Sequence, residues 1–173
     1  TKLEKGEFHQ NAKVYDIWET LTTVAFGAEK RIAEKQLRVE GLAPVRTLVY
    51  ADPDIVHQVA FNLVDNAVKF AGAEGVISFH VWEKQGRVYV GIKNTGEGIP
   101  KEDVAHIFDR FYKADKSRSL HVEGAGLGLY ICKKLLNKSG GDIMVRSKQG
   151  SFTEFVFNLP AGIEEKTKGA KPQ

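Results

Sequence analysis

Residues 61–71 read FNLVDNAVKFA and lie within a longer segment, residues 52–71, that predicts a helix. Asp52 is suited to cap this helix and Pro53 to occupy its first position. At about 100° per residue, the polar side chains fall within a sector of about 100°, and the apolar ones cover other directions. The polar set is Gln58, Asn62, Asp65, Asn66 and Lys69, and the apolar set includes Val59, Leu63, Ala67 and Phe70. We therefore expect a helix that is buried on most sides and polar along one narrow stripe.

The polar stripe holds two asparagines, Asn62 and Asn66, and a lysine, Lys69. A stripe that simply faces solvent is one interpretation, since most amphipathic helices have a polar side. Asparagine is a poor helix former, however, and an uncommon choice for that purpose. Its amide oxygen suits Mg²⁺, and a lysine ammonium suits a phosphate. Taken alone, the stripe fits both interpretations.

Composition limits the classes of protein that the chain can represent. The 173 residues are 42% hydrophobic and 27% charged, which suits one globular domain with a buried core. The single cysteine, Cys132, excludes a disulfide framework and a cysteine-cluster metal site, and it indicates a reducing compartment. The formal net charge of +3 is too small to indicate nucleic-acid binding. No apolar run reaches the ~20 residues of a membrane span. We expect a cytoplasmic segment of a longer protein, with no direct membrane contact and with the parent's membrane attachment left open.

The remaining sequence predicts a mixed order of helices and strands. Apolar residues at steps of three and four predict a helix over residues 14–32. Short strands are expected at 37–42 and 46–52, and a hairpin at 76–83 and 87–94. A polar, glycine-rich stretch from 95 to 128 contains a short predicted helix at 102–108. A helix from 127 that stops at Gly140 and Gly141, and strands at 142–148 and 151–160, complete the α/β order.

Two glycine-rich segments flank the polar stretch. NTGEGIP at 94–100 begins at the end of a predicted strand. Its glycines, Gly96 and Gly98, allow a sharp turn and let another group approach the backbone closely. GAGLGL at 124–129 opens a helix, whose first N–H groups and dipole suit a phosphate. Each segment alone is also explained by an ordinary turn. Neither is a P-loop or a Rossmann fingerprint, so together they indicate another nucleotide-binding fold.

Four ordered motifs resemble the catalytic and ATP-binding domain of bacterial sensor histidine kinases. HQVAFNLVDNAVKFA resembles that family's asparagine box, VGIKNTGEGIP its first glycine box, IFDRFYKADKSRS its phenylalanine box, and GAGLGLYICKKLL its second glycine box. The resemblance covers about residues 13–160. It implies the Bergerat fold, an α/β sandwich with a mixed sheet packed on one face by three helices and ATP beneath a mobile lid. Residues 1–12 are then a linker, and residues 161–173 a C-terminal tail.

The resemblance implies a role for each matching residue. Asn66 holds the Mg²⁺ that bridges the phosphates, Asn62 lies nearby, and Lys69 points toward the phosphates. Phe70 lines the adenine pocket and Thr153 faces the adenine. The other matching positions are Gly96, Gly98 and Ile99 in the first glycine box; Gly124, Gly126, Leu127, Gly128 and Leu129 in the second; Phe108 and Phe111 as the lid anchor; and Arg110, Tyr112, Lys113 and Arg118 in the lid. A basic lid residue that reaches the γ-phosphate is one interpretation of this last group, and solvated loop cations are the other.

Asn94 departs from the pattern, because the first glycine box usually begins with an aspartate that accepts a bond from the adenine amino group. The Asn94 amide oxygen still accepts such a bond, but a neutral acceptor is weaker by roughly 1 kcal/mol. A several-fold lower affinity for ATP is therefore expected. The departure also leaves open a degenerate module that binds nucleotide and regulates without catalysis.

Asn62 bears on the reaction type. In related chaperone, topoisomerase and mismatch-repair ATPases of this fold, a glutamate at this position activates water. An amide cannot act as a general base at neutral pH, so we expect phosphoryl transfer and slow hydrolysis. An ATPase or serine kinase of the same fold is the alternative that the missing glutamate disfavours.

The five histidines lack the sequence context of the family's phosphoacceptor. They are His9, His57, His80, His106 and His121. The resemblance therefore implies an acceptor histidine on a separate helical hairpin of a homodimeric parent, and an aspartate on a response regulator as the next acceptor.

Overall fold

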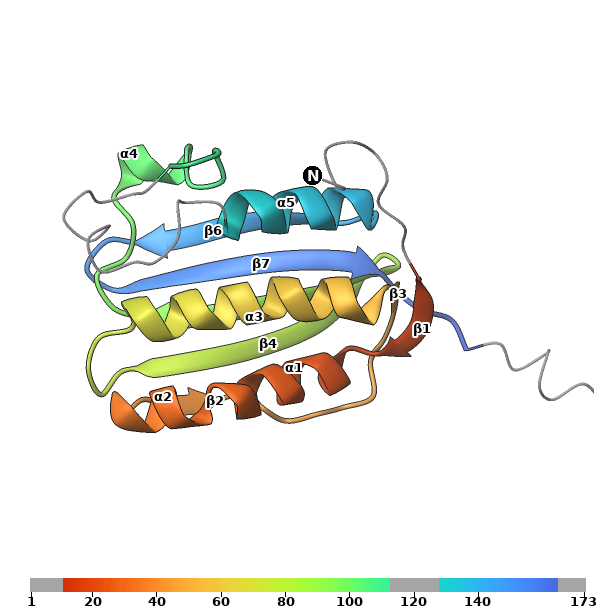
Figure 1. The fold of residues 1–173 in the computed structure, drawn as a ribbon, viewed down its shortest axis with the longest axis horizontal. Coiled ribbons are helices and arrows are strands. Elements are labelled where there is room, and N and C mark those ends of the chain that lie inside the picture. Colours follow the sequence, from red (N-terminus) through yellow and green to blue (C-terminus); the bar gives the residue numbers. More distant parts are fainter. Residues whose placement is uncertain (1–10, 113–127, 165–173) are drawn as a thin grey trace, which may run out of the picture.

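A five-stranded mixed sheet carries helices on one of its faces in the computed structural model, which describes residues 11–112 and 128–164 (Figure 1). The strands are β1 Lys13–Asp16, β2 Arg38–Glu40, β3 Leu48–Ala51, β4 Val76–Lys84, β5 Arg87–Thr95, β6 Asp142–Lys148 and β7 Phe152–Pro160. The helices are α1 Ile17–Gly27, α2 Glu29–Glu34, α3 Pro53–Phe70, α4 Lys101–Val104 and α5 Gly128–Lys138. Helices α1, α3 and α5 lie across the same face of the sheet (Figure 1). The predicted α/β sandwich is confirmed.

The sheet has the strand order β2-β4-β5-β7-β6. Only β2 and β4 pair in parallel, and the other neighbours are antiparallel. Along β5 and β7, most of the alternate residues on the buried face are apolar, as in the cross-strand pairs Val90↔Phe157 and Ile92↔Phe155. This period of two gives the sheet one apolar face, which the helices cover.

Helix α3 lies between α1 and α5 in the helical layer (Figure 1). The Asp52 carboxylate caps it by accepting a 2.9 Å bond from the N–H of Asp54, and proline occupies the first turn. Val56, Val59 and Leu63 are fully buried, whereas the polar stripe is half-buried or exposed. The prediction for residues 52–71 is confirmed, and this helix is the centre of the core.

The prediction of one helix over residues 14–32 is wrong in two respects: the helix begins later, and it is divided in two. Residues 13–16 form β1, which pairs antiparallel with β3 into a two-stranded ribbon. Asp16 then caps α1 through a 3.0 Å bond from the N–H of Trp18. The helix also breaks after Gly27, since Ala28 has a non-helical ψ of 3°. The predicted helix at 102–108 is shorter as well, because only Lys101–Val104 is α-helical.

The remaining predicted elements form with small shifts of their ends. Within residues 11–112 and 128–164, no helix has both the length and the hydrophobicity that crossing a membrane requires.

Ala161 forms an isolated bridge with Val49, and the N–H of Gly162 donates to the carbonyl of Leu48 at 2.8 Å. The predicted boundaries of the domain, with a linker up to residue 12 and a tail from residue 161, stay predictions.

Candidate functional site

The polar stripe of α3 is the starting point of the site. Asn62, Asn66, Lys69 and Phe70 are all half-buried. The Asn62 amide Nδ2 donates to the Cys132 thiol of α5 at 3.6 Å. Within the described part of the chain, the Asn66 side chain has no hydrogen-bond partner. A half-buried amide without a protein partner is suited to a ligand, and its oxygen is a suitable donor to Mg²⁺.

Asp65, in the same stripe, holds two cations. Its Oδ1 accepts a hydrogen bond from the Arg31 guanidinium of α2, and its Oδ2 lies 3.2 Å from the Lys69 ammonium. Arg31 was not among the residues expected from the sequence, because 34 positions separate it from Asp65. The site therefore carries one carboxylate shared between two positive side chains.

Gly98 lies in the loop that follows β5, where its backbone has φ of +76°. A Cβ at this position would lie 2.5 Å from the Lys148 carbonyl oxygen. Gly96 is also tightly placed, since a Cβ there would lie 2.6 Å from the Phe70 carbonyl oxygen. Both glycines thus let the loop approach its neighbours closely, Gly96 at the C-terminal end of α3 and Gly98 at the β6–β7 turn.

Asn94 and Thr153 lie opposite each other at the ends of β5 and β7. They are polar residues inside the core, with 5% and 7% of their surfaces exposed. The Asn94 Nδ2 donates to the Thr95 carbonyl at 3.1 Å, and no described residue donates to its Oδ1. Ser147 joins this cluster: its Oγ accepts from the N–H of Ile99 at 2.7 Å and lies 3.4 Å from the Thr153 hydroxyl. The sequence reasoning missed Ser147, because a lone serine in a strand carries no signal.

The residues on the two sides of the expected lid are partly described. The Phe108 ring packs edge-on against Phe155, with centroids 6.0 Å apart, whereas Phe111 is 59% exposed with φ of +65°. Tyr112 donates its hydroxyl to Asp103, and this bond raises the pKa of Tyr112 to about 12. Lys113, Arg118, Gly124, Gly126 and Leu127 lie outside the described residues.

The second glycine box is described from the first residue of α5 onward. Leu129 packs on the core. A Cβ at Gly128 would meet nothing within 4 Å, so the described surroundings do not require glycine there. Its role in the second glycine box stays a prediction.

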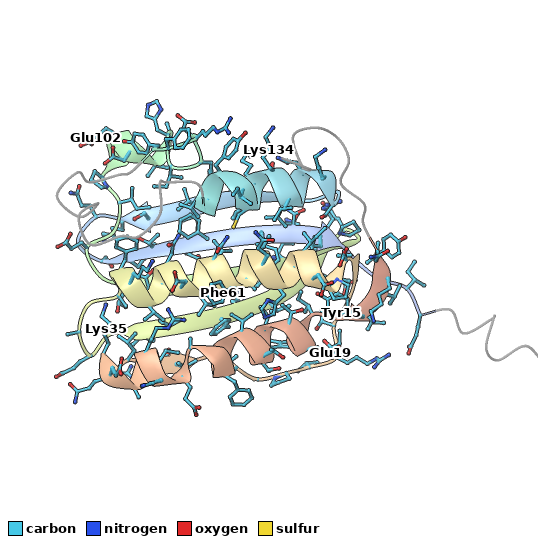
Figure 2. All side chains as sticks on the ribbon, in the orientation of Figure 1. Tyr15, Glu19, Lys35, Phe61, Glu102 and Lys134 are labelled. Atoms are coloured by element: carbon cyan, nitrogen blue, oxygen red, sulfur yellow. The ribbon has the colours of Figure 1, made fainter. Side chains whose placement is uncertain are left out.

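The structure also has a cleft of about 610 Å³ at the β1–β3 ribbon. It is lined by Lys13, Val14, Tyr15, Asp16, Glu19, Arg46, Leu48, Tyr50, Ile163 and Glu164. Figure 2 places Tyr15 and Glu19 at the opposite end of the molecule from Lys35 and Glu102. The cleft is therefore separate from the polar stripe near the C-terminal end of α3.

Metal binding at the stripe would depend on an amide and on phosphate oxygens. Among residues 11–112 and 128–164, no group of three or more histidine, cysteine, aspartate or glutamate side chains is placed to hold a metal ion. Mg²⁺ commonly keeps several waters and takes only one or two protein oxygens beside substrate phosphates. The residues present fit that arrangement.

Comparison with known proteins identifies similar sequences and structures. Residues 51–163 match the family model described as "Histidine kinase-, DNA gyrase B-, and HSP90-like ATPase". The sensor histidine kinase WalK of Bacillus subtilis is 40% identical over 119 residues, which are 68% of this chain and 20% of WalK. The catalytic domain of the histidine kinase ThkA superposes with a TM-score of 0.74 at 27% identity, over 87% of this chain and 95% of that one. Full-length ShkA in complex with AMPPNP gives 0.81 at 28% identity, over 94% of this chain and 34% of ShkA.

The chain belongs to this ATPase family, whose model matches most of its length. Within the family, it is the ATP-binding catalytic domain of a sensor histidine kinase. It spans about a fifth of the length of the curated relatives that it matches.

Proposed function

We propose that this domain binds ATP with Mg²⁺ and transfers the γ-phosphoryl group to a histidine on a separate helical hairpin of the parent kinase. In that step the imidazole nitrogen attacks the γ-phosphorus, the bond to the β-phosphate oxygen breaks, and ADP leaves. The observation that supports the proposal most is the half-buried Asn66 amide, without a described partner, one helical turn from Lys69.

The side chains of α3 act by binding and orientation. The Asn66 oxygen would hold Mg²⁺, which neutralises phosphate charge when bound. Lys69 supplies a positive group on the phosphate side, and Phe70 packs against the base. Asn62 lies one helical turn before Asn66, and its bond to the Cys132 thiol of α5 orients it. Catalysis would come mainly from positioning and charge compensation.

Adenine recognition falls to the buried cluster at the ends of β5 and β7. The Asn94 Oδ1 would accept from the adenine amino group, with Thr153 beside it. Gly96, Gly98 and Ile99 would shape the loop against the base. The loop and lid positions Tyr112, Lys113, Arg118, Gly124, Gly126, Leu127, Gly128 and Leu129 would close over the phosphates.

The kinase proposal has two alternatives. The amide at Asn62 disfavours an ATPase, because an amide cannot take a proton from water at neutral pH. A regulatory module that binds nucleotide without catalysis is favoured by the amide at Asn94. We further propose a cytoplasmic location, a homodimeric parent and a response regulator as the next acceptor.

The test is phosphoryl transfer in trans. The domain is mixed with the parent's histidine hairpin and γ-labelled ATP, and labelled hairpin is followed over time. The proposal predicts labelling that requires Mg²⁺, is lost in Asn66→Ala and persists in Asn137→Ala, a matched asparagine on the exposed side of α5. Binding of ATP without labelling would support the regulatory module, and rapid release of free phosphate would support an ATPase.

A further inference from the structure

Helix α2 and the residue after it hold the C-terminal end of α3. The Lys35 ammonium donates to three carbonyl oxygens there: Val68 at 2.7 Å, Lys69 at 3.1 Å and Ala71 at 2.8 Å. The last carbonyls of a helix have no partner within the helix and carry its negative dipole end. Lys35 satisfies them, and so it fixes the backbone of Lys69.

Helix α2 also holds the side chain of Lys69, through Asp65. Its ammonium pairs with Asp65 one turn earlier, and Asp65 in turn pairs with Arg31 of α2. The three side chains are partly shielded, with 38% of Arg31, 23% of Asp65 and 30% of Lys69 exposed. Since the Asp65 carboxylate is shared, neither cation is fully neutralised by it.

This sharing has a consequence for a phosphate ligand. Asp65 and Lys69 alone would form a neutral pair at i,i+4, and the carboxylate would compete with phosphate for the ammonium. With Arg31 present, the group of three carries a net positive charge. Lys69 is then both oriented by Asp65 and available to an anion.

We propose that Arg31, acting through Asp65, is a positioning residue for Lys69. This inference rests on the proposed function, in which Lys69 faces the phosphates of ATP. Arg31 itself need not touch the nucleotide. Its role is to compensate Asp65, so that the ammonium keeps its place and its attraction for phosphate.

A double-mutant cycle tests this role in the intact domain. The variants are Arg31→Ala, Lys69→Ala and the double variant, each titrated with ATP and Mg²⁺ by calorimetry. We expect Arg31→Ala to weaken ATP binding by about threefold to tenfold, which is typical of coupled neighbours. In the Lys69→Ala background, the same change should have less than about a twofold effect. Arg31→Lys should recover part of the loss, because it keeps the charge but not the planar fork.

Two controls separate positioning from general damage to the fold. Adenosine has no phosphates, so its affinity, followed by NMR titration, should not change in Arg31→Ala. Arg38→Ala removes an exposed pair with Glu40 on β2 and should leave ATP affinity unchanged. Equal losses for adenosine and ATP would assign Arg31 a structural role and overturn the proposal.

Two further results also overturn it. In the first, the wild-type domain binds ATP, but Arg31→Ala leaves the affinity for ATP unchanged, or the losses in the two single variants add up in the double variant. Either outcome would refute the positioning role and leave the proposed function intact. Failure of the wild-type domain to bind ATP would refute the proposed function, and the positioning role would fall with it.

Discussion

Asn94 on β5 lies directly opposite Thr153 on β7, and both side chains are buried in the apolar face of the sheet. We predict that Asn94→Asp tightens ATP binding by about 1 kcal/mol, or roughly fivefold, because a carboxylate is the stronger acceptor for the adenine amino group. Calorimetric titration measures this change. Asn137→Asp, on the exposed side of α5, is the control. Unchanged or weaker binding in Asn94→Asp would contradict the assigned role of Asn94.

Gly98 and Gly86 form a matched pair for testing the glycine loop, since their φ angles are +76° and +77°. A Cβ at Gly98 would lie 2.5 Å from the Lys148 carbonyl oxygen, whereas one at Gly86 would meet nothing within 4 Å. Gly86→Ala should cost about 1 kcal/mol of unfolding free energy through backbone strain alone. Gly98→Ala should cost more, about 2–4 kcal/mol, and also weaken ATP binding. Urea denaturation compares the two, and equal losses would show that the close approach at Gly98 is not needed.

Lys35 is expected to stabilise the fold as well as the site. Lys35→Met keeps the aliphatic stem but leaves three carbonyls at the end of α3 without their donor. We expect a loss of about 1–3 kcal/mol in the free energy of unfolding. Lys30→Met, at an exposed position of helix α2, which ends just before Lys35, should change the free energy of unfolding by less than about 0.5 kcal/mol. Chemical denaturation followed by circular dichroism gives both values, and similar values would exclude the role of Lys35.

Cys132 is fully buried, and burial raises the pKa of its thiol to about 12. The native thiol should therefore stay protonated and unreactive toward a disulfide reagent at pH 8, and become reactive on unfolding. Because its native pKa lies above the ordinary value of 9.0, the associated stability is present below about pH 9 and is lost as the pH rises toward 12. Timed labelling with and without denaturant measures the reactivity. Rapid native labelling at pH 8 would contradict the burial.

Local signals in the sequence were sufficient for α3. A cap at Asp52, a proline at the next position and a continuous helical period all agree, and the observed bounds match the prediction. The prediction for the start of α1 was wrong because Val14, which lies in β1, also fits the helical spacing to Ile17 and Trp18. Its strand depends on pairing with residues 48–51, a contact between distant segments that periodicity does not reveal.

For the site as well, the sequence revealed the parts that depend on local motifs and not the contacts between distant segments. The asparagine stripe and the first glycine box are contiguous in sequence, so motif spacing was enough to find them. The contacts of Asp65 with Arg31 and of Asn62 with Cys132 join residues 34 and 70 positions apart. They depend on how α2 and α5 pack beside α3, which single-sequence patterns do not specify.

Binding of ATP through Asn66 is the central claim, and calorimetric titration with and without Mg²⁺ tests it most directly. We predict that the wild-type domain binds ATP and that Mg²⁺ tightens the binding. We also predict that Asn66→Ala abolishes the effect of Mg²⁺, whereas Asn137→Ala retains it. Absence of binding at millimolar ATP, or an unchanged response to Mg²⁺ in Asn66→Ala, would contradict the claim.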